Sequence, residues 1–197
     1  MKRVKLVVAY DGTNYCGWQV QKNGETIESV LNRAIGELTG EEIHVMGSSR
    51  TDAGVHACGN VAVFDTEARM AADKFSYALN QRLPEDIRIQ DSCEVPADFH
   101  PRFQKTVKTY EYRILNREFP LPAYRFNSHF TYRKLDVERM RQAAAYLIGE
   151  HDFQSFCAAG AQVKTTVRTI YALDVEKQGD LIILRITGNG FLYNMVR

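Results

Sequence analysis

The sequence has no pair of cysteines spaced like a metal site or a disulfide framework. Its four cysteines are Cys16, Cys58, Cys93 and Cys157, and none belongs to a CxxC motif. Zinc sites and disulfide-rich scaffolds both depend on repeated short cysteine spacings. We therefore predict reduced thiols, as in a cytosolic protein, and no metal site.

Long hydrophobic runs are also missing. The apolar run near the N-terminus, residues 4–10, is shorter than the core of a secretory signal, and polar residues follow it at once. No stretch approaches the ~20 apolar residues that a transmembrane helix needs. We expect a cytoplasmic protein that makes no membrane contact.

An excess of charge of one sign is absent as well. Twenty-five Lys and Arg residues stand against 24 Asp and Glu residues, so the net charge is +1. A nucleic-acid partner would therefore require basic side chains gathered on one face. One part of the sequence does interleave basic and aromatic residues: Arg102, Lys105, Lys108, Tyr110, Tyr112, Arg113, Tyr124, Arg125, Tyr132, Arg133 and Lys134. The group favours contacts with phosphates, although any single member could be a solvated charge or a half-buried ring.

Hydrophobic residues make up 45% of the 197, enough for one large core or two small ones. Residues 1–104 carry strand and helix patterns in the order β-α-β-β-α-β, the ferredoxin-like unit. The apolar patterns predict strands over 4–10, 43–47, 60–65 and 86–95, and helices over 27–38 and 71–81. Thr26 is the expected N-cap of the first helix.

Residues 105–197 repeat this architecture without repeating the sequence. Strand patterns occupy 107–115, 166–176 and 181–187, one helix follows Asp136, and another is expected over 191–197. A closing strand is missing, so we expect this unit to be incomplete at its C-terminus. The predicted class is α+β: two ferredoxin-like domains, 1–104 and 105–197, that form a broad antiparallel sheet with helices on one face. The other face would be open to a ligand, as in RNA recognition modules.

A polar, glycine-bounded stretch, residues 47–57, lies between two of the predicted strands and reads GSSRTDAGVHA. This composition is typical of a loop at strand ends. It places Asp52 two residues from Arg50. A lone carboxylate beside a guanidinium fits covalent catalysis by that carboxylate. It equally fits an Asx turn over 52–54 that Arg50 holds in place, and the residues alone leave both interpretations open.

Two other chemistries are disfavoured by spacing. The serines of the loop, Asp52 and His56 are too close along one segment to form a hydrolase triad, and no nucleophile elbow is present. Neither His100 nor the pair at 151–152 adds metal-ligand spacing to this loop. A further loop, residues 11–19, carries Tyr15 and Trp18, which could stack on a base or pack against the sheet.

Six motifs together resemble the tRNA pseudouridine synthase A family. In chain order they lie at 10–12, 17–19, 50–56, 108–113, 151–153 and 190–197. They span essentially the whole chain in the family's order, and the motif at 50–56 (RTDAGVH) is highly specific. Two departures are visible: Ser49 stands where the family often has Gly, and the chain stops at Arg197, where the family continues.

The resemblance implies isomerisation of uridine to pseudouridine at positions 38, 39 and 40 of the tRNA anticodon arm. The reaction is redox-neutral and needs no external group, so no cofactor is expected. The implied partner is tRNA, and the implied assembly is a homodimer. A non-catalytic RNA-binding protein and a small-molecule enzyme that uses the loop for hydrolysis are the alternatives.

The resemblance also implies roles for single residues. Asp52 matches the catalytic aspartate, which could attack C1′ of the ribose, add to C6 of uracil or assist elimination at C2′. Tyr110 matches a tyrosine that stacks on the flipped uracil and could help to remove the C5 proton. Arg197 matches the basic partner that keeps the aspartate ionised, and Arg50 would hold the base out of its stack. Other residues expected to contact RNA are Lys108, Arg102 and Arg113.

Overall fold

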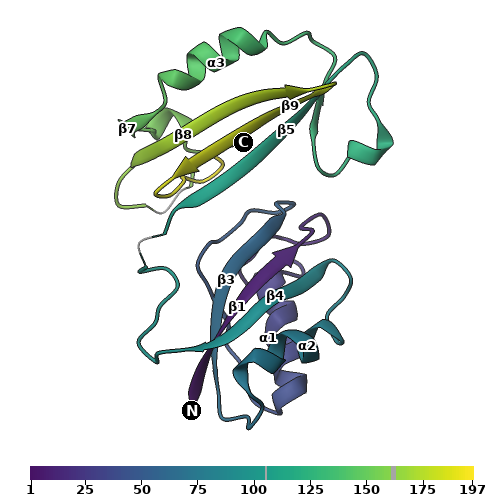
Figure 1. The fold of residues 1–197 in the computed structure, drawn as a ribbon, viewed down its shortest axis with the longest axis vertical. Helices are drawn as coiled ribbons and strands as arrows, with labels where there is room; N and C mark the ends of the chain where they lie inside the picture. The colour runs from purple at the N-terminus through teal and green to yellow at the C-terminus, as the bar shows by residue number, and fades with distance from the viewer. Residues whose placement is uncertain (105, 161–162) are drawn as a thin grey trace. The chain divides into compact units, whose positions relative to one another are not determined.

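The computed structural model describes residues 1–104, 106–160 and 163–197. The chain forms two compact units, Met1–Gln104 and Lys105–Arg197 (Figure 1). Each unit combines one sheet with helices, so the predicted α+β class is confirmed. Lys105, part of the predicted basic and aromatic group, lies outside the described residues. In the part of the chain that is described, no helix has both the length and the apolar character to span a bilayer.

The first unit has the predicted β-α-β-β-α-β order. Its elements are β1 (Lys2–Tyr10), α1 (Ile27–Thr39), β2 (Met46–Gly47), β3 (Ala57–Thr66), a 3-10 turn η1 (Ala72–Lys74), α2 (Phe75–Asn80) and β4 (Ile87–Val95). The sheet runs β2-β3-β1-β4, and all its neighbours are antiparallel. The ferredoxin-like prediction is therefore confirmed for this unit.

Both helices of this unit cover the same side of the sheet (Figure 1). Thr26 caps α1 as predicted: its hydroxyl accepts a hydrogen bond from the Ser29 N–H, and the Ser29 hydroxyl oxygen accepts one from the Thr26 N–H. The apolar side of α1 packs with alternate residues of β1 in one core that includes Ile27, Leu31, Ile35, Val4, Leu6 and Val8. The strands that flank the 47–57 stretch are thus fixed on a packed layer.

β2 is shorter than the predicted strand over 43–47. Ile43 and Val45 are buried as expected. However, the Val45 N–H donates to Oδ1 of Asn32 on α1, at 2.8 Å. The backbone at Val45 is therefore bonded to a helix side chain, and pairing with β3 begins only at Met46.

The second unit contains the predicted strands and two short extra ones. Its elements are β5 (Lys108–Asn116), η2 (Pro122–Tyr124), β6 (His129–Thr131), α3 (Val137–Ala145), β7 (Gly149–Asp152), η3 (Gln154–Phe156), β8 (Val167–Gln178) and β9 (Leu181–Gly188). The sheet runs β6-β5-β9-β8-β7 and is antiparallel except at the β5–β6 pair. The nine strands therefore form two sheets among the described residues, one in each unit.

Residues 191–197 are not helical, so that prediction is wrong. Asn194 has φ 57, in the left-handed region, and Met195 N–H donates to the Leu192 carbonyl at 3.1 Å to close a turn. A left-handed residue interrupts the helical hydrogen-bond ladder. Leu192 and Met195 instead lie in a small core with Ile186.

Candidate active site

Asp52 opens a tight turn in the connection between β2 and β3. The Val55 N–H donates to the Asp52 carbonyl at 3.1 Å, and Gly54 takes the left-handed conformation that the turn requires, with φ 77. The bond that closes the turn uses the backbone of Asp52 and not its carboxylate. The Asp52 side chain is half-buried, whereas Arg50 is exposed.

Thr51, the residue directly before Asp52, is held at two points. Its carbonyl accepts a hydrogen bond of 3.0 Å from the backbone N–H of Trp18. Its hydroxyl oxygen lies 2.7 Å from the hydroxyl of Tyr10, at the end of β1. Because both the backbone and the side chain are anchored, the Cα of Asp52 has little freedom to move relative to the sheet.

Trp18 and Tyr15 are both buried, so the packing interpretation of these rings is the correct one. Trp18 lies against the backbone of Gly47, at the start of the loop. The Tyr15 hydroxyl donates to Oδ1 of Asp86 at 2.6 Å, and its carbonyl accepts a bond of 3.4 Å from Gly54 N–H. The 11–19 loop therefore holds the turn at Asp52 through backbone hydrogen bonds. Its two rings are buried and do not face a ligand.

Asn60 holds the first half of the loop from β3. Its buried amide oxygen accepts hydrogen bonds from the Ser48 hydroxyl at 3.0 Å and from the Ser49 N–H at 3.3 Å. Its amide nitrogen donates to the Ser49 carbonyl at 3.0 Å. Sequence reasoning did not identify this residue. The available signal was a polar side chain at the first position of the predicted strand over 60–65, close after a polar loop.

His56 and Asp11 close the other end of the loop. Nδ1 of His56 lies 3.0 Å from Oδ1 of Asp11 and 3.2 Å from the backbone nitrogen of Gly12. Hydrogen bonds from Thr13 lower the pKa of Asp11, and the nearby His56 adds to this effect. Nδ1 of His56 thus faces both the Asp11 carboxylate and the Gly12 N–H, which joins this end of the loop to the 11–19 segment. Among the residues that the structure describes, the contact of this kind beside the loop joins Asp11 to His56, and no ion pair joins Arg50 to Asp52.

Two predicted RNA-contacting cations come together at the start of the loop. Arg102 donates from Nε to the Gly47 carbonyl at 2.9 Å, which ties the segment before the domain boundary to the loop. Burial lowers the pKa of Arg102, and the positive charge of Arg50 lowers it further. Two guanidinium groups that repel each other near a loop provide a natural place for an anion such as a phosphate.

Tyr110 is half-buried on β5 in the second unit. Its ring meets the ring of Phe191 edge to face, with centroids 5.0 Å apart and an interplanar angle of 82°. Tyr110 lies opposite Ile186 of β9 and packs on the same small core. The segment that ends at the exposed Arg197 therefore reaches Tyr110 through Phe191.

Lys108 and Arg113 lie on different faces of β5, because side chains alternate along a strand. Lys108 shares its face with Tyr110. Arg113 lies on the opposite face, where its Nε donates to Oε1 of Glu111 at 2.7 Å. Arg185 of β9 bonds the same carboxylate at 2.9 Å. The pKa of Glu111 is lowered by Arg113 first and by Arg185 as well, so this face carries a charge network separate from Tyr110.

The structure thus places Asp52, Arg50 and Arg102 in the first unit, with Arg50 close enough to influence the charge of Arg102. It places Tyr110, Lys108, Arg113 and Arg197 in the second, with Arg113 apart from Tyr110. Within the described ranges, no three His, Cys, Asp or Glu side chains gather where they could hold a metal ion.

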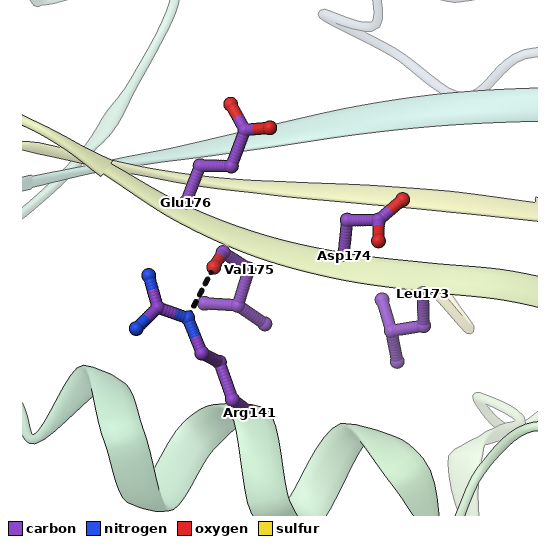
Figure 2. Close-up of a pocket in the computed structure, with 5 residues that line it drawn as sticks. All are labelled: Arg141, Leu173, Asp174, Val175 and Glu176. Carbon is purple, nitrogen blue, oxygen red and sulfur yellow. Dashed lines mark hydrogen bonds between the residues drawn. The ribbon is translucent and has the colours of Figure 1, made fainter.

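A pocket of about 390 Å³ lies between α3 and β8 and involves none of the predicted site residues. Arg141 crosses it and donates from Nε to the Val175 carbonyl at 2.9 Å (Figure 2). The other lining residues are Leu173, Asp174 and Glu176.

Comparison with known proteins gives the same family that the motifs suggested. The model of the tRNA pseudouridine synthase family matches residues 6–104 and 143–197. The chain is 49% identical over 197 residues to tRNA pseudouridine synthase A of Acetivibrio thermocellus, covering 100% of this chain and 81% of that protein. It is 50% identical over 198 residues to tRNA pseudouridine synthase A of Thermoanaerobacter sp., with the same coverage. For the protein of that name in Citrifermentans bemidjiense the identity is 48%, over 79% of its length. The predicted resemblance is confirmed: the chain belongs to the tRNA pseudouridine synthase family.

Proposed function

We propose that the chain isomerises uridine to pseudouridine at positions 38, 39 and 40 of the tRNA anticodon arm, with Asp52 as the catalytic nucleophile. The observation that carries the proposal is the bracing of Asp52: its turn is supported from β1, β3 and the 11–19 loop, while its carboxylate takes no part in closing that turn. The names of relatives that are about half identical over the whole chain support the same activity.

The reaction fits one positioned carboxylate. The N1–C1′ bond breaks, the uracil turns, a C5–C1′ bond forms, and the C5 proton is lost while N1 gains one, so the product is an isomer. An ionised Asp52 can attack C1′, add to C6 or assist elimination at C2′. Each route needs the target nucleotide out of its stack, because a stacked base shields these atoms.

The remaining residues receive supporting roles. Arg50 and Arg102 would bind phosphates beside the loop, and Arg50 would fill the gap that the flipped base leaves. Tyr110 would stack on the uracil and accept or relay the C5 proton. Arg197 would pair with Asp52 and keep it ionised. Lys108 and Arg113 would contact the RNA backbone.

We also propose that the protein works as a homodimer in the cytoplasm. Several neighbouring nucleotides are easier to reach if one subunit holds the tRNA body while the other presents its active site. Light scattering of the purified protein, with and without tRNA, tests the dimer. A monomeric mass at working concentration would rule it out.

The function is tested with anticodon stem-loop RNA tritiated at uracil C5, because tritium is released only when that carbon exchanges its proton. Asp52→Asn should abolish release and leave the dissociation constant of the RNA within about threefold of wild type. Asp73→Asn, which removes an exposed carboxylate of the same unit, is the matched control and should keep full activity.

The alternatives give different results in the same assay. Full activity in the Asp52→Asn variant would disprove the proposed role of this carboxylate. A wild-type protein that binds RNA without tritium release would be a non-catalytic binder. A small-molecule enzyme would show no RNA affinity that falls with salt.

A further inference from the structure

The connection between β5 and α3 forms a distinct arm, residues 117–134, which contains η2 and β6 (Figure 1). The arm lies outside both segments that the family model matches. None of the residues assigned to the active site belongs to it. Its role is therefore not supplied by the family assignment.

The arm is fastened at its base by the β5–β6 pairing and by the side chain of Asn116. The amide nitrogen of Asn116 donates to the carbonyls of Thr131 and Arg133, at 3.0 and 2.7 Å. Its amide oxygen accepts from the Leu135 N–H at 3.1 Å. Because strand pairing and these three hydrogen bonds hold the returning segment to the end of β5, the base of the arm has a defined position.

The arm has an excess of positive charge. It carries Arg117, Arg125, Arg133 and Lys134 against one acidic residue, Glu118, so its net charge is +3. The whole chain carries only +1, which leaves −2 for the rest. Arg117 is partly neutralised by an ion pair with Asp180 at 3.2 Å, and the three cations at 125, 133 and 134 remain as a local positive excess of the kind that a polyanion-binding surface requires.

Large aromatic rings stand among these charges. Phe119 and Tyr132 are 66% and 69% exposed. Phe126 is 54% exposed, and the guanidinium of Arg125 lies over its ring, 4.1 Å from the centroid. Rings exposed beside cations are the combination that binds single-stranded or looped RNA, since bases stack on the rings while the cations meet phosphates.

We infer that the 117–134 arm is a second RNA-binding surface, which holds the sugar-phosphate backbone of the substrate and stacks on its unpaired bases. The inference rests on the proposed function, because the RNA is the tRNA that the active site modifies. The alternative partner for this surface is the arm of a second copy of the chain. Symmetric contact between two arms would bring +3 against +3, which like-charge repulsion opposes.

The test removes the arm's charges and measures RNA binding apart from catalysis. The triple variant Arg125→Ala, Arg133→Ala, Lys134→Ala should raise the dissociation constant of tRNA about 10- to 100-fold. The slope of log affinity against log salt should become shallower by about 2. KM should rise with the dissociation constant while kcat stays unchanged, since the arm does not touch the reacting atoms.

A matched variant loses the same charge elsewhere. Lys74→Ala, Arg139→Ala, Lys177→Ala removes three exposed cations outside the arm and should change neither affinity nor salt slope by more than a small factor. The variant Phe119→Ser, Tyr132→Ser should weaken binding with an unchanged salt slope, because stacking releases no counterions. Circular dichroism confirms that each variant is folded.

Three outcomes overturn the inference. An arm variant with wild-type affinity and salt slope excludes RNA contact by the arm, even if pseudouridine still forms. Equal losses in the arm variant and its matched control make the effect one of net charge alone. A change of oligomeric mass in the aromatic variant, with RNA affinity intact, assigns the arm to a protein interface. If instead no pseudouridine forms but the arm variants lose RNA affinity, the proposed function fails and the inference stands.

Discussion

The indole of Trp18 lies so close to the backbone of Gly47 that a Cβ added there would sit 2.4 Å from its ring atoms. No side chain larger than hydrogen fits without moving the ring or the strand. Since Trp18 also binds the Thr51 carbonyl, the displacement would reach the residue next to Asp52.

Gly47→Ala is therefore expected to lower the free energy of unfolding of the first unit by about 1–3 kcal/mol through overpacking. It should also lower kcat. Trp18 is the chain's one tryptophan, so its fluorescence reports unfolding of this unit in urea. Gly190→Ala, where the nearest atoms lie 3.8 and 3.9 Å away on the Arg168 side chain, is the control and should leave the first unit unaffected.

Thr51→Val should lower kcat more than it changes KM. The substitution removes the hydroxyl that meets Tyr10 and keeps the β-branched shape, so the anchor before Asp52 is loosened at an expected cost of about 1 kcal/mol in stability. Thr51→Ser restores the hydroxyl and should recover most of the activity. An equal loss of kcat in both variants would show that the hydroxyl does not position Asp52.

Alkaline pH should destabilise the first unit through Tyr15. Burial raises the pKa of the Tyr15 hydroxyl, and its hydrogen bond to Asp86 raises it further. A raised pKa in the folded state means that the stabilisation is complete below the unfolded pKa, about 10, and is lost as pH rises above it. Urea unfolding followed by far-ultraviolet circular dichroism should show this decline between about pH 8 and about pH 11. Tyr15→Phe, although less stable at neutral pH, should decline less steeply.

Acid should weaken the same unit through Asp65. Arg3 and Asp65 face each other across β1 and β3 and form two parallel hydrogen bonds, at 2.8 and 2.7 Å. The bond from Arg3 holds the pKa of Asp65 below its usual value. The contribution is therefore complete above the unfolded pKa, about 3.9, and lost as pH falls through the folded value. Asp65→Asn should remove about 1 kcal/mol at neutral pH and flatten the acid limb of the stability profile. An acid limb as steep as that of wild type would contradict this assignment.

Where the sequence predicted the fold correctly, local periodicity decided the structure. The apolar spacing of α1 and the alternation in β1 each bury one face, and the elements formed as expected. The failures have tertiary causes. Residues 192 and 195 have spacing that suits a helix and a docked turn alike, and only the left-handed Asn194 separates them. β6 and β7 have only three and four residues, which is too short for a periodic pattern, so their strand conformation depends on pairing with neighbouring strands.

The candidate site was also predicted only in part from the sequence. Asp52 and Arg50 were evident because a polar loop between apolar strands displays them. The hydrogen bonds that fix the loop join residues far apart in sequence: Thr51 and Tyr10 are separated by 41 positions, and Arg102 and Gly47 by 55. No local pattern encodes such pairs. The opposite faces of Tyr110 and Arg113 on β5 follow from alternation, but the Glu111 and Arg185 network on the second face needed the β5–β9 register.

Asn60 gives the loop a property that matters when a partner arrives. Three of the hydrogen bonds of its buried amide need Ser48 and Ser49 in place, so the loop and β3 order together as the protein folds. Fixing a residue's backbone costs about 1–2 kcal/mol in conformational entropy. For this loop that cost is met during folding, so more of the contact energy with a ligand remains as affinity. Amide protons of the loop should accordingly exchange with solvent as slowly before RNA is added as after.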